Sequence, residues 1–239
     1  MRWPLVVAVF GAVVLALAAQ PARATNECRG LQVCVRVAGP WVVVPSALGT
    51  PRPRVDFQLS CPRGYAIGGL DAELSDRAID IGFVGKLGSP IGPGVTALRS
   101  ALFGAAYVGA SARAPSFRPH LGCIPMAGGG SGPVPYRRVG AAGATFPPGE
   151  PTVRRVRTIR LQAGTVRVVA VCGAAERLLW GWHAIGFYTA SPPSAALMQS
   201  VGTTRTLRSG GVLVTARGGA ELSSVRAIVQ VGAVCAGGK

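Results

Sequence analysis

The sequence predicts an all-β fold with two tandem antiparallel β-sandwich-like modules, each closed by a disulfide, after a signal peptide. Short runs rich in Val, Ile, Leu, Phe and Thr recur between Gly and Pro turns. Two pairs of cysteines have nearly equal spacings, and after the N-terminal apolar run no long capped helical pattern occurs. The 239 residues include 34 Gly and 19 Pro, with 49% hydrophobic and 14% charged residues. This composition excludes a disordered chain, a collagen and a helical bundle.

Residues 1–24 are typical of a cleaved signal peptide. Arg2 gives a positive start, residues 5–19 are uncharged and apolar, and Ala22-Arg23-Ala24 has the small-x-small form of a cleavage site. The apolar run is shorter than the roughly 20 residues that span a bilayer; a retained membrane anchor is the alternative. No later segment is a candidate span, so we expect a secreted or cell-surface protein.

The cysteines predict a disulfide scheme. An even number of cysteines in an exported chain indicates disulfides, and without a CxxC pair, and with only two histidines, zinc is disfavoured. The spacings of Cys61 to Cys123 and Cys172 to Cys235 differ by one residue. The simplest pairing is therefore Cys61–Cys123, Cys172–Cys235 and Cys28–Cys34. The rival is the swapped pairing of Cys61 with Cys172 and Cys123 with Cys235.

The surroundings of these cysteines predict an internal duplication. A strand-like run precedes each first cysteine, at 55–60 and 166–171, and an Ile-Gly-Phe triplet follows at 81–83 and 185–187, at different offsets that require a gap. We expect an N-terminal segment with a small disulfide loop at 25–34 and a first β-module at 35–126. A Gly/Pro-rich linker follows at 127–151, and then a second β-module at 152–239, whose first strands could begin near residue 135.

Each strand is expected where an apolar run lies between turns. The predicted strands are 41–44, 55–60, 79–84, 102–108, 157–161, 166–171, 184–188, 211–216 and 225–234. In the last of these, small apolar residues alternate with Arg226 and Gln230, which predicts one face in water. Residues 70–78 and 194–201 are predicted to be single helical turns or loops.

A short motif follows the first long-range cysteine. Cys61-Pro62-x-Gly64-x-x-x-Gly68-Gly69, with a later strand ending at Cys123, resembles a repeat of exported proteins from high-GC Gram-positive bacteria. The second module departs from it, with Cys172-Gly173-Ala174 at the start and Trp180-Gly181-Trp182 near the Gly-Gly position. The resemblance implies bacterial export and β-structure, and it carries no catalytic residue.

The charge balance is strongly basic, with 25 Lys+Arg against 9 Asp+Glu and a net charge of +16. In a strand, Arg155 and Arg157 would project from one face, and Arg154 and Arg160 from the other. Such a cluster attracts anionic polymers such as teichoic acid, acidic polysaccharide, nucleic acid or lipid headgroups. Missing aromatic interleaving argues against nucleic acid, and a solvated surface that aids solubility is the alternative. The candidate anion-binding residues are Arg137, Arg138, Arg154, Arg155, Arg157, Arg160 and Arg167.

Catalytic signals are sparse. Nucleophile-elbow, phosphate-loop, zinc-protease, EF-hand and dinucleotide motifs are absent from the sequence. The one acidic cluster is read mainly as a solvated loop, with a calcium site or a glycosidase pair as alternatives; its members are Asp71, Glu73, Asp76 and Asp80.

The remaining candidates are aromatic or histidine side chains. Trp180 and Trp182, followed by His183, are read mainly as core residues, with a sugar-stacking platform or a catalytic base as alternatives. His120 is expected on the surface. The sequence therefore predicts an exported, non-enzymatic structural or binding protein of the cell envelope, without cofactor or metal. A secreted hydrolase or a carbohydrate-binding module is the alternative.

Overall fold

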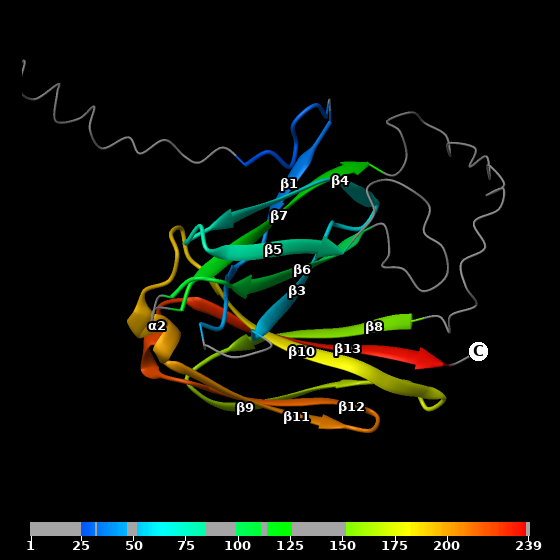
Figure 1. Ribbon diagram of the computed structural model, residues 1–239, viewed down its shortest axis with the longest axis vertical. Coiled ribbons are helices and arrows are strands. Elements are labelled where there is room, and N and C mark those ends of the chain that lie inside the picture. Colours follow the sequence, from blue (N-terminus) through cyan, green and yellow to red (C-terminus); the bar gives the residue numbers. More distant parts are fainter. Residues whose placement is uncertain are drawn as a thin grey trace, which may run out of the picture.

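The computed structural model describes residues 25–31, 33–46, 52–84, 99–110, 114–125 and 152–237. The predicted signal peptide and linker lie outside these ranges. The all-β prediction is confirmed, since the described chain consists of antiparallel strands with one short α-helix and one 3-10 helix (Figure 1). Within the described ranges, no helix is long and apolar enough to cross a membrane.

The elements follow one another along the chain in the order given next, and most of them are labelled in Figure 1. They are β1 (Val35–Ala38), β2 (Trp41–Val43), β3 (Arg54–Ser60), β4 (Tyr65–Leu74), β5 (Ile79–Val84), β6 (Ser100–Tyr107), β7 (Ser116–Pro125), β8 (Thr152–Leu161), β9 (Gly164–Val171), β10 (Glu176–Tyr188), α2 (Ala195–Gln199), β11 (Val201–Arg208), β12 (Gly211–Gly218), η1 (Ala220–Ser223) and β13 (Arg226–Gly237).

These strands form three antiparallel sheets. The largest has the order β1-β7-β2-β10-β13-β8, with β4 paired to β7; the smaller ones are β3-β6-β5 and β9-β12-β11. The largest sheet takes strands from both predicted modules, because β2 pairs with β7 on one side and with β10 on the other. In Figure 1 the sheet β9-β12-β11 lies on one side of β8, β10 and β13, and β3 lies on the other.

The two halves of the chain share one strand order. β1 and β3–β7 correspond to β8 and β9–β13, and the three-stranded sheets β3-β6-β5 and β9-β12-β11 are connected in the same way. Val35 pairs with Cys123 as Val153 pairs with Cys235. The register shifts directly after Ile67 in β4 and after Leu178 in β10. Apart from β2, which has no counterpart among the described strands of the second half, the two pairing schemes agree.

One part of the sequence comparison is wrong. The Ile-Gly-Phe triplets lie in β5 and in β10, which occupy different positions in the shared order. The counterpart of β5 is β11, which has a polar sequence with three threonines. The two triplets therefore have the same sequence but not equivalent positions in the fold, because Ile-Gly-Phe is compatible with an outer strand and with a central strand.

Two cores stabilise the halves. The first packs Phe57, Phe103 and Phe117 between β3, β6 and β7, and the second packs Val214 and Val229 between β12 and β13. Ala184 and Ile228 of the second half belong to the first core, so the halves share buried apolar surface.

The prediction that one face of β13 is exposed to water is wrong. Odd-numbered residues of β13 face the second core as expected, but Ile228 and Gln230 on the other face are also buried, the latter with 3% exposure. The amide of Gln230 reaches β3 across 172 positions of sequence. Gln58 N donates to Gln230 Oε1 (2.6 Å), and Gln230 Nε2 donates to Gln58 O (3.0 Å) and to Thr158 Oγ1 (3.2 Å). The first half therefore covers this face.

Residues 70–78 are only in part a turn, so that prediction is corrected. β4 runs to Leu74, because Leu70 and Leu74 pack against the first core while Asp71 and Glu73 point away from it. The prediction for 194–201 is confirmed. Ser194 caps the short helix α2, and its Oγ accepts from Leu197 N at 3.2 Å.

Candidate functional site

All three disulfides have the predicted pairing, Cys28–Cys34, Cys61–Cys123 and Cys172–Cys235. The swapped pairing is excluded. Each long-range bridge joins the residue after an outer strand (β3 or β9) to the last strand of the same half (β7 or β13). Cys172 and Cys235 come close to Glu176, but both sulfurs are bonded to each other and offer no thiolate to a metal.

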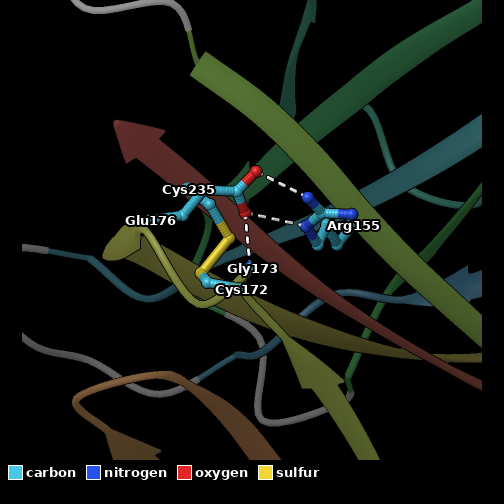
Figure 2. Close-up of a disulfide and its surroundings, with 5 residues drawn as sticks. All are labelled: Arg155, Cys172, Gly173, Glu176 and Cys235. Atoms are coloured by element: carbon cyan, nitrogen blue, oxygen red, sulfur yellow. Dashed lines mark hydrogen bonds and ion pairs between the residues drawn. A yellow bond between two sulfur atoms is a disulfide. The ribbon is translucent and has the colours of Figure 1, made fainter. Parts of the chain in front are cut away.

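Arg155 of the predicted basic cluster is bound within the protein. Its Nε and Nη2 donate to Glu176 at 2.9 and 2.5 Å, and Gly173 N donates to the same carboxylate at 2.6 Å (Figure 2). These donors, Arg155 first, lower the pKa of Glu176. Arg155 is therefore a structural partner of the turn next to the disulfide.

Arg154 projects from the opposite face of β8, as the alternation predicts, toward the first half. Burial lowers its pKa, and the nearby Asp56 carboxylate acts in the other direction. Asp56 is buried on β3 and accepts from Arg54 Nε at 3.2 Å. Burial raises the pKa of Asp56, against the effects of Arg54 and Arg154. Arg154 thus contributes to the junction between the halves.

The predicted arginine cluster does not converge on one surface. Arg157 and Arg160 are exposed on opposite faces of β8, and Arg167 is exposed on β9 in a different sheet. Arg137 and Arg138 lie outside the described residues.

A different basic surface is present on the sheet β9-β12-β11. Val168, Ala170, Val212, Val214 and Ala216 face the core, so the alternate residues point outward. We call this outward side the basic face. Its residues are Thr165, Arg167, Val169 and Val171 on β9, Leu213, Thr215 and Arg217 on β12, and Gly202, Thr204, Thr206 and Arg208 on β11.

The basic face carries three guanidinium groups and no carboxylate at its outward positions. Arg167 pairs with Thr215, and Arg217 pairs with Thr165 in the next row, so two arginines are diagonal neighbours. Arg208 lies at the far end of β11. Sequence reasoning found only Arg167; Arg208 and Arg217 are recognisable once β11 and β12 are known to alternate between core and solvent.

The surrounding charge favours the same surface. Among residues 152–237, ten arginines stand against two carboxylates, those of Glu176 and Glu221. Glu176 is already bound to Arg155. The six acidic residues of the described first half are all at or before Asp80. The second half is therefore the positively charged part of the described chain.

The predicted acidic cluster is not a solvated loop, because Asp71 and Glu73 lie on β4 and Asp80 lies on β5. Asp71, Glu73 and Asp76 line one open hollow of about 390 Å³ together with Arg77.

The carboxylates of this hollow are held by protein groups. Asp71 accepts from Asn26 N at 2.6 Å and from Ala72 N at 2.8 Å. Asp76 accepts from Ala78 N at 2.8 Å and from Tyr107 Oη at 3.2 Å. The acidic residues therefore act first as structural acceptors.

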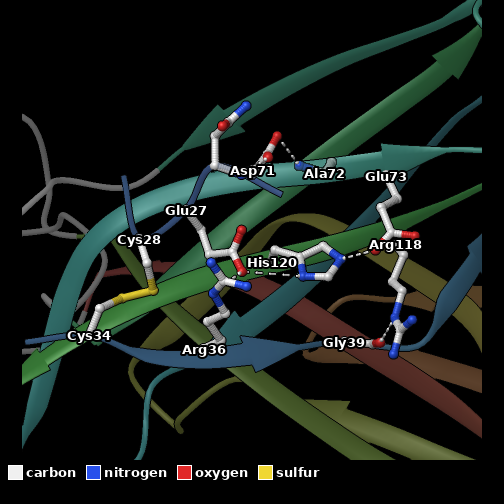
Figure 3. A network of polar contacts seen from close by, with 11 residues as sticks. Glu27, Cys28, Cys34, Arg36, Gly39, Asp71, Ala72, Glu73, Arg118 and His120 are labelled. Carbon is white, nitrogen blue, oxygen red and sulfur yellow. Dashed lines mark hydrogen bonds and ion pairs between the residues drawn. A yellow bond between two sulfur atoms is a disulfide. The ribbon is translucent and has the colours of Figure 1, made fainter. Parts of the chain in front are cut away.

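The surface position predicted for His120 is wrong, since the side chain is buried. His120 Nε2 lies 2.9 Å from Glu73 Oε1, and Nδ1 lies 3.9 Å from Glu27 Oε1, whose carboxylate is also 3.7 Å from Arg36 Nε (Figure 3). The N-terminal segment covers His120, because Glu27 comes from that segment. A segment far away in sequence thus contributes to the burial of this residue.

The N-terminal segment at residues 25–34, here called the plug, lies on a glycine pair. Gly69 and Gly122 are cross-strand partners, and a Cβ atom added to them would lie 1.8 and 2.0 Å from the Glu27 carbonyl oxygen. Only glycine permits this approach of the plug backbone to the sheet. The last Gly of the Cys-Pro-x-Gly-x-x-x-Gly-Gly motif, Gly69, therefore has a packing role.

Trp180, Trp182 and His183 do not form one site. Trp182 has 2% exposure and lies over Gly232, whereas Trp180 is 41% exposed and stacks on Trp182 at a ring distance of 5.1 Å. A platform of two exposed indoles is therefore not formed. His183 follows Trp182 in β10 and faces β11, where its Nε2 lies 3.0 Å from Thr203 Oγ1.

Three described features bear on function: the basic face, the acidic hollow and a cleft where the halves meet. No family model, curated protein or solved structure matches the chain.

Proposed function

We propose that the protein is an exported, non-enzymatic binding protein of the bacterial cell envelope that holds anionic polymers, such as teichoic acid or acidic polysaccharide, on the basic face. The observation that carries the proposal is the side of β9-β12-β11 with Arg167, Arg208 and Arg217 outward and no carboxylate among its outward positions. A cationic sheet surface suits an extended chain of negative charges. The threonine hydroxyls between the arginines add hydrogen-bond donors.

The class of polymer follows from what the basic face lacks. Its outward positions hold no aromatic side chain, and base stacking on aromatic rings is a main source of affinity for single-stranded nucleic acid. This favours polymers with phosphate or carboxylate groups and no bases. Disulfides are typical of oxidising compartments, which supports an extracellular location.

The proposal includes a duplicated framework. The strand order, the position of the long disulfide and the register shift after Ile67 and Leu178 agree between the halves. These agreements support two sandwich-like copies of one module, of which the second carries the binding surface.

The test is calorimetric titration of the full chain with lipoteichoic acid and with polygalacturonate. The triple variant Arg167→Gln, Arg208→Gln, Arg217→Gln should bind roughly tenfold more weakly or worse, since each lost charged contact contributes on the order of 1 kcal/mol. The matched control is Arg29→Gln, Arg63→Gln, Arg77→Gln, which removes the same charge from exposed positions of the first half. It should retain affinity to within about twofold, a change near 0.4 kcal/mol.

Salt and a neutral polymer complete the test. Affinity for the polymer should fall steeply between about 0.05 and about 0.5 M NaCl, because the Debye length shortens and salt screens the attraction between the charges. Equal losses in both triple variants, or binding that persists at about 1 M NaCl, would contradict recognition by the basic face. Equally tight binding to uncharged dextran would point to carbohydrate recognition instead.

A further inference from the structure

A cleft of about 400 Å³ opens where the two halves meet, apart from the basic face. It is lined by residues at and after the end of β2, just before and at the start of β3, in the middle of β10 and on β11. Arg54, Arg205, His183 and Thr203 provide its polar groups, and Val43 and Ile185 are among its apolar residues. Its volume lies in the range of sites for small organic molecules.

The polar groups of the cleft are held in place by protein contacts. Arg205 Nη1 donates to Gly181 O at 3.0 Å, which fixes the guanidinium and leaves its other N–H groups to serve further acceptors. His183 Nε2 and Thr203 Oγ1 are 3.0 Å apart. The other ring nitrogen of His183, Nδ1, is buried and has no hydrogen-bond partner among the described residues.

The described lining of the cleft contains two arginines and no carboxylate. Arg54 contacts the buried Asp56 through Nε, and Asp56 also lies near Arg154, so one carboxylate faces two guanidinium groups. Arg205, on β11, adds a further positive charge to the lining. Burial first, and then the charge of Arg205, lower the pKa of His183. The ring is therefore neutral at pH 7, and the positive charge of the cleft comes from the arginines.

We propose that this cleft binds a small organic acid, with the carboxylate at Arg205 and an apolar body against Val43 and Ile185. Guanidinium groups pair well with carboxylates, and a fixed guanidinium loses little conformational entropy on binding. Apolar walls beside a positive end select an acid with a hydrocarbon part over an inorganic anion. The cleft is a separate site from the basic face and does not depend on it.

The two histidines of the chain provide the readout, because His183 lines the cleft and His120 is buried in the other half. The full chain is titrated with octanoate at pH 7, and the imidazole carbon-bound proton signals are followed by NMR. A saturable shift of the His183 signals, with the His120 signals unchanged, is expected. Octyl glucoside, which has the same apolar chain without a charge, and inorganic phosphate should bind at least tenfold more weakly, a difference of about 1.4 kcal/mol.

Matched variants test whether Arg205 supplies the positive charge that binds the carboxylate. Arg205→Gln should weaken octanoate binding roughly tenfold to hundredfold, the usual range for a lost charged hydrogen bond. Arg217→Gln, on the basic face, should not change it. Unchanged His120 signals show that Arg205→Gln is folded, and Arg205→Lys should recover part of the affinity.

The outcomes are separable from those for polymer binding. The triple variant of the basic face should keep octanoate affinity even if polymer binding proves absent. The proposal is overturned if octanoate shifts neither histidine or both alike, if octyl glucoside or phosphate binds as well as octanoate, or if Arg205→Gln binds octanoate like the parent.

Discussion

The two halves of the molecule use the same pairing scheme but fill the outer side of their larger sheet differently. In the first half the plug lies on Gly69 and Gly122, and its backbone occupies the space that side chains would take. At the corresponding pair of the second half stand Trp180 and Val234, directly after the same register shift. The residue pair after the register shift therefore decides what covers the two strands. With two glycines the plug backbone packs on them, and with Trp and Val their own side chains cover them.

The second half also uses that side for contact with the first half. Trp182 lies over Gly232, and Gln230 reaches the backbone of Gln58. The first half contributes most of the described acidic residues, and the second contributes the basic face. The two halves thus have the same strand connectivity but surfaces of different charge, and we expect the surface charge to specify binding.

The largest expected effect tests the equivalence of the halves. Cys61→Ala with Cys123→Ala, and Cys172→Ala with Cys235→Ala, should each lower the free energy of unfolding by about 4 kcal/mol, because both bridges close loops of nearly equal length. Losing Cys28–Cys34 should cost roughly 2.4 kcal/mol, since that loop is short. Urea denaturation measures all three. A loss for one long bridge more than twice that for the other would break the equivalence.

An intermediate effect tests the plug. Gly122→Ala places a methyl group against the Glu27 carbonyl and should lower the free energy of unfolding by about 2 kcal/mol. The plug should also be displaced, so reduction of Cys28–Cys34 by dithiothreitol should become faster. Val234→Ala is the matched change in the second half and should cost about 1 kcal/mol without affecting that reduction rate. Equal reduction rates in parent and Gly122→Ala would show that the plug does not depend on this glycine.

The smallest effect concerns His183, whose pKa in the folded protein lies below its ordinary value of 6.5. The neutral ring is the form that the fold accommodates, so this stability is present above the unfolded pKa and is lost as the pH falls from 6.5 through the folded pKa. His183→Gln should flatten the dependence of unfolding free energy on pH between about 7 and about 5. Asp56, whose pKa is raised, titrates in both proteins and cancels in the difference. An identical slope in parent and variant would contradict this assignment.

Local patterns predicted the disulfides and most strands correctly, because both depend on spacing along the chain. β5 has the predicted bounds, and α2 follows its Ser194 cap. Of β7 only a strand ending at Cys123 was expected, since Pro119, Gly122 and Pro125 interrupt its apolar pattern, and β11 was missed because most of its residues are polar. In both strands tertiary pairing prevails over local propensity.

The candidate sites were less accessible to prediction. Clustering of arginines in sequence says little about clustering in space, because neighbours in a strand alternate between faces; Arg154 and Arg155 end on opposite sides of β8. The cleft combines Arg54 and Arg205, which are 151 positions apart in the chain. Only the packing of the halves brings them to the same place.

The contact between Gln230 and β3 has a consequence for self-association. β3 is an outer strand of its sheet, and unpaired backbone groups on such a strand can recruit another molecule into a growing fibre. The amide of Gln230 meets the N–H and the carbonyl of Gln58 in the middle of this strand, as a neighbouring backbone would. A single side chain thus occupies backbone groups of β3 that could otherwise pair with another molecule.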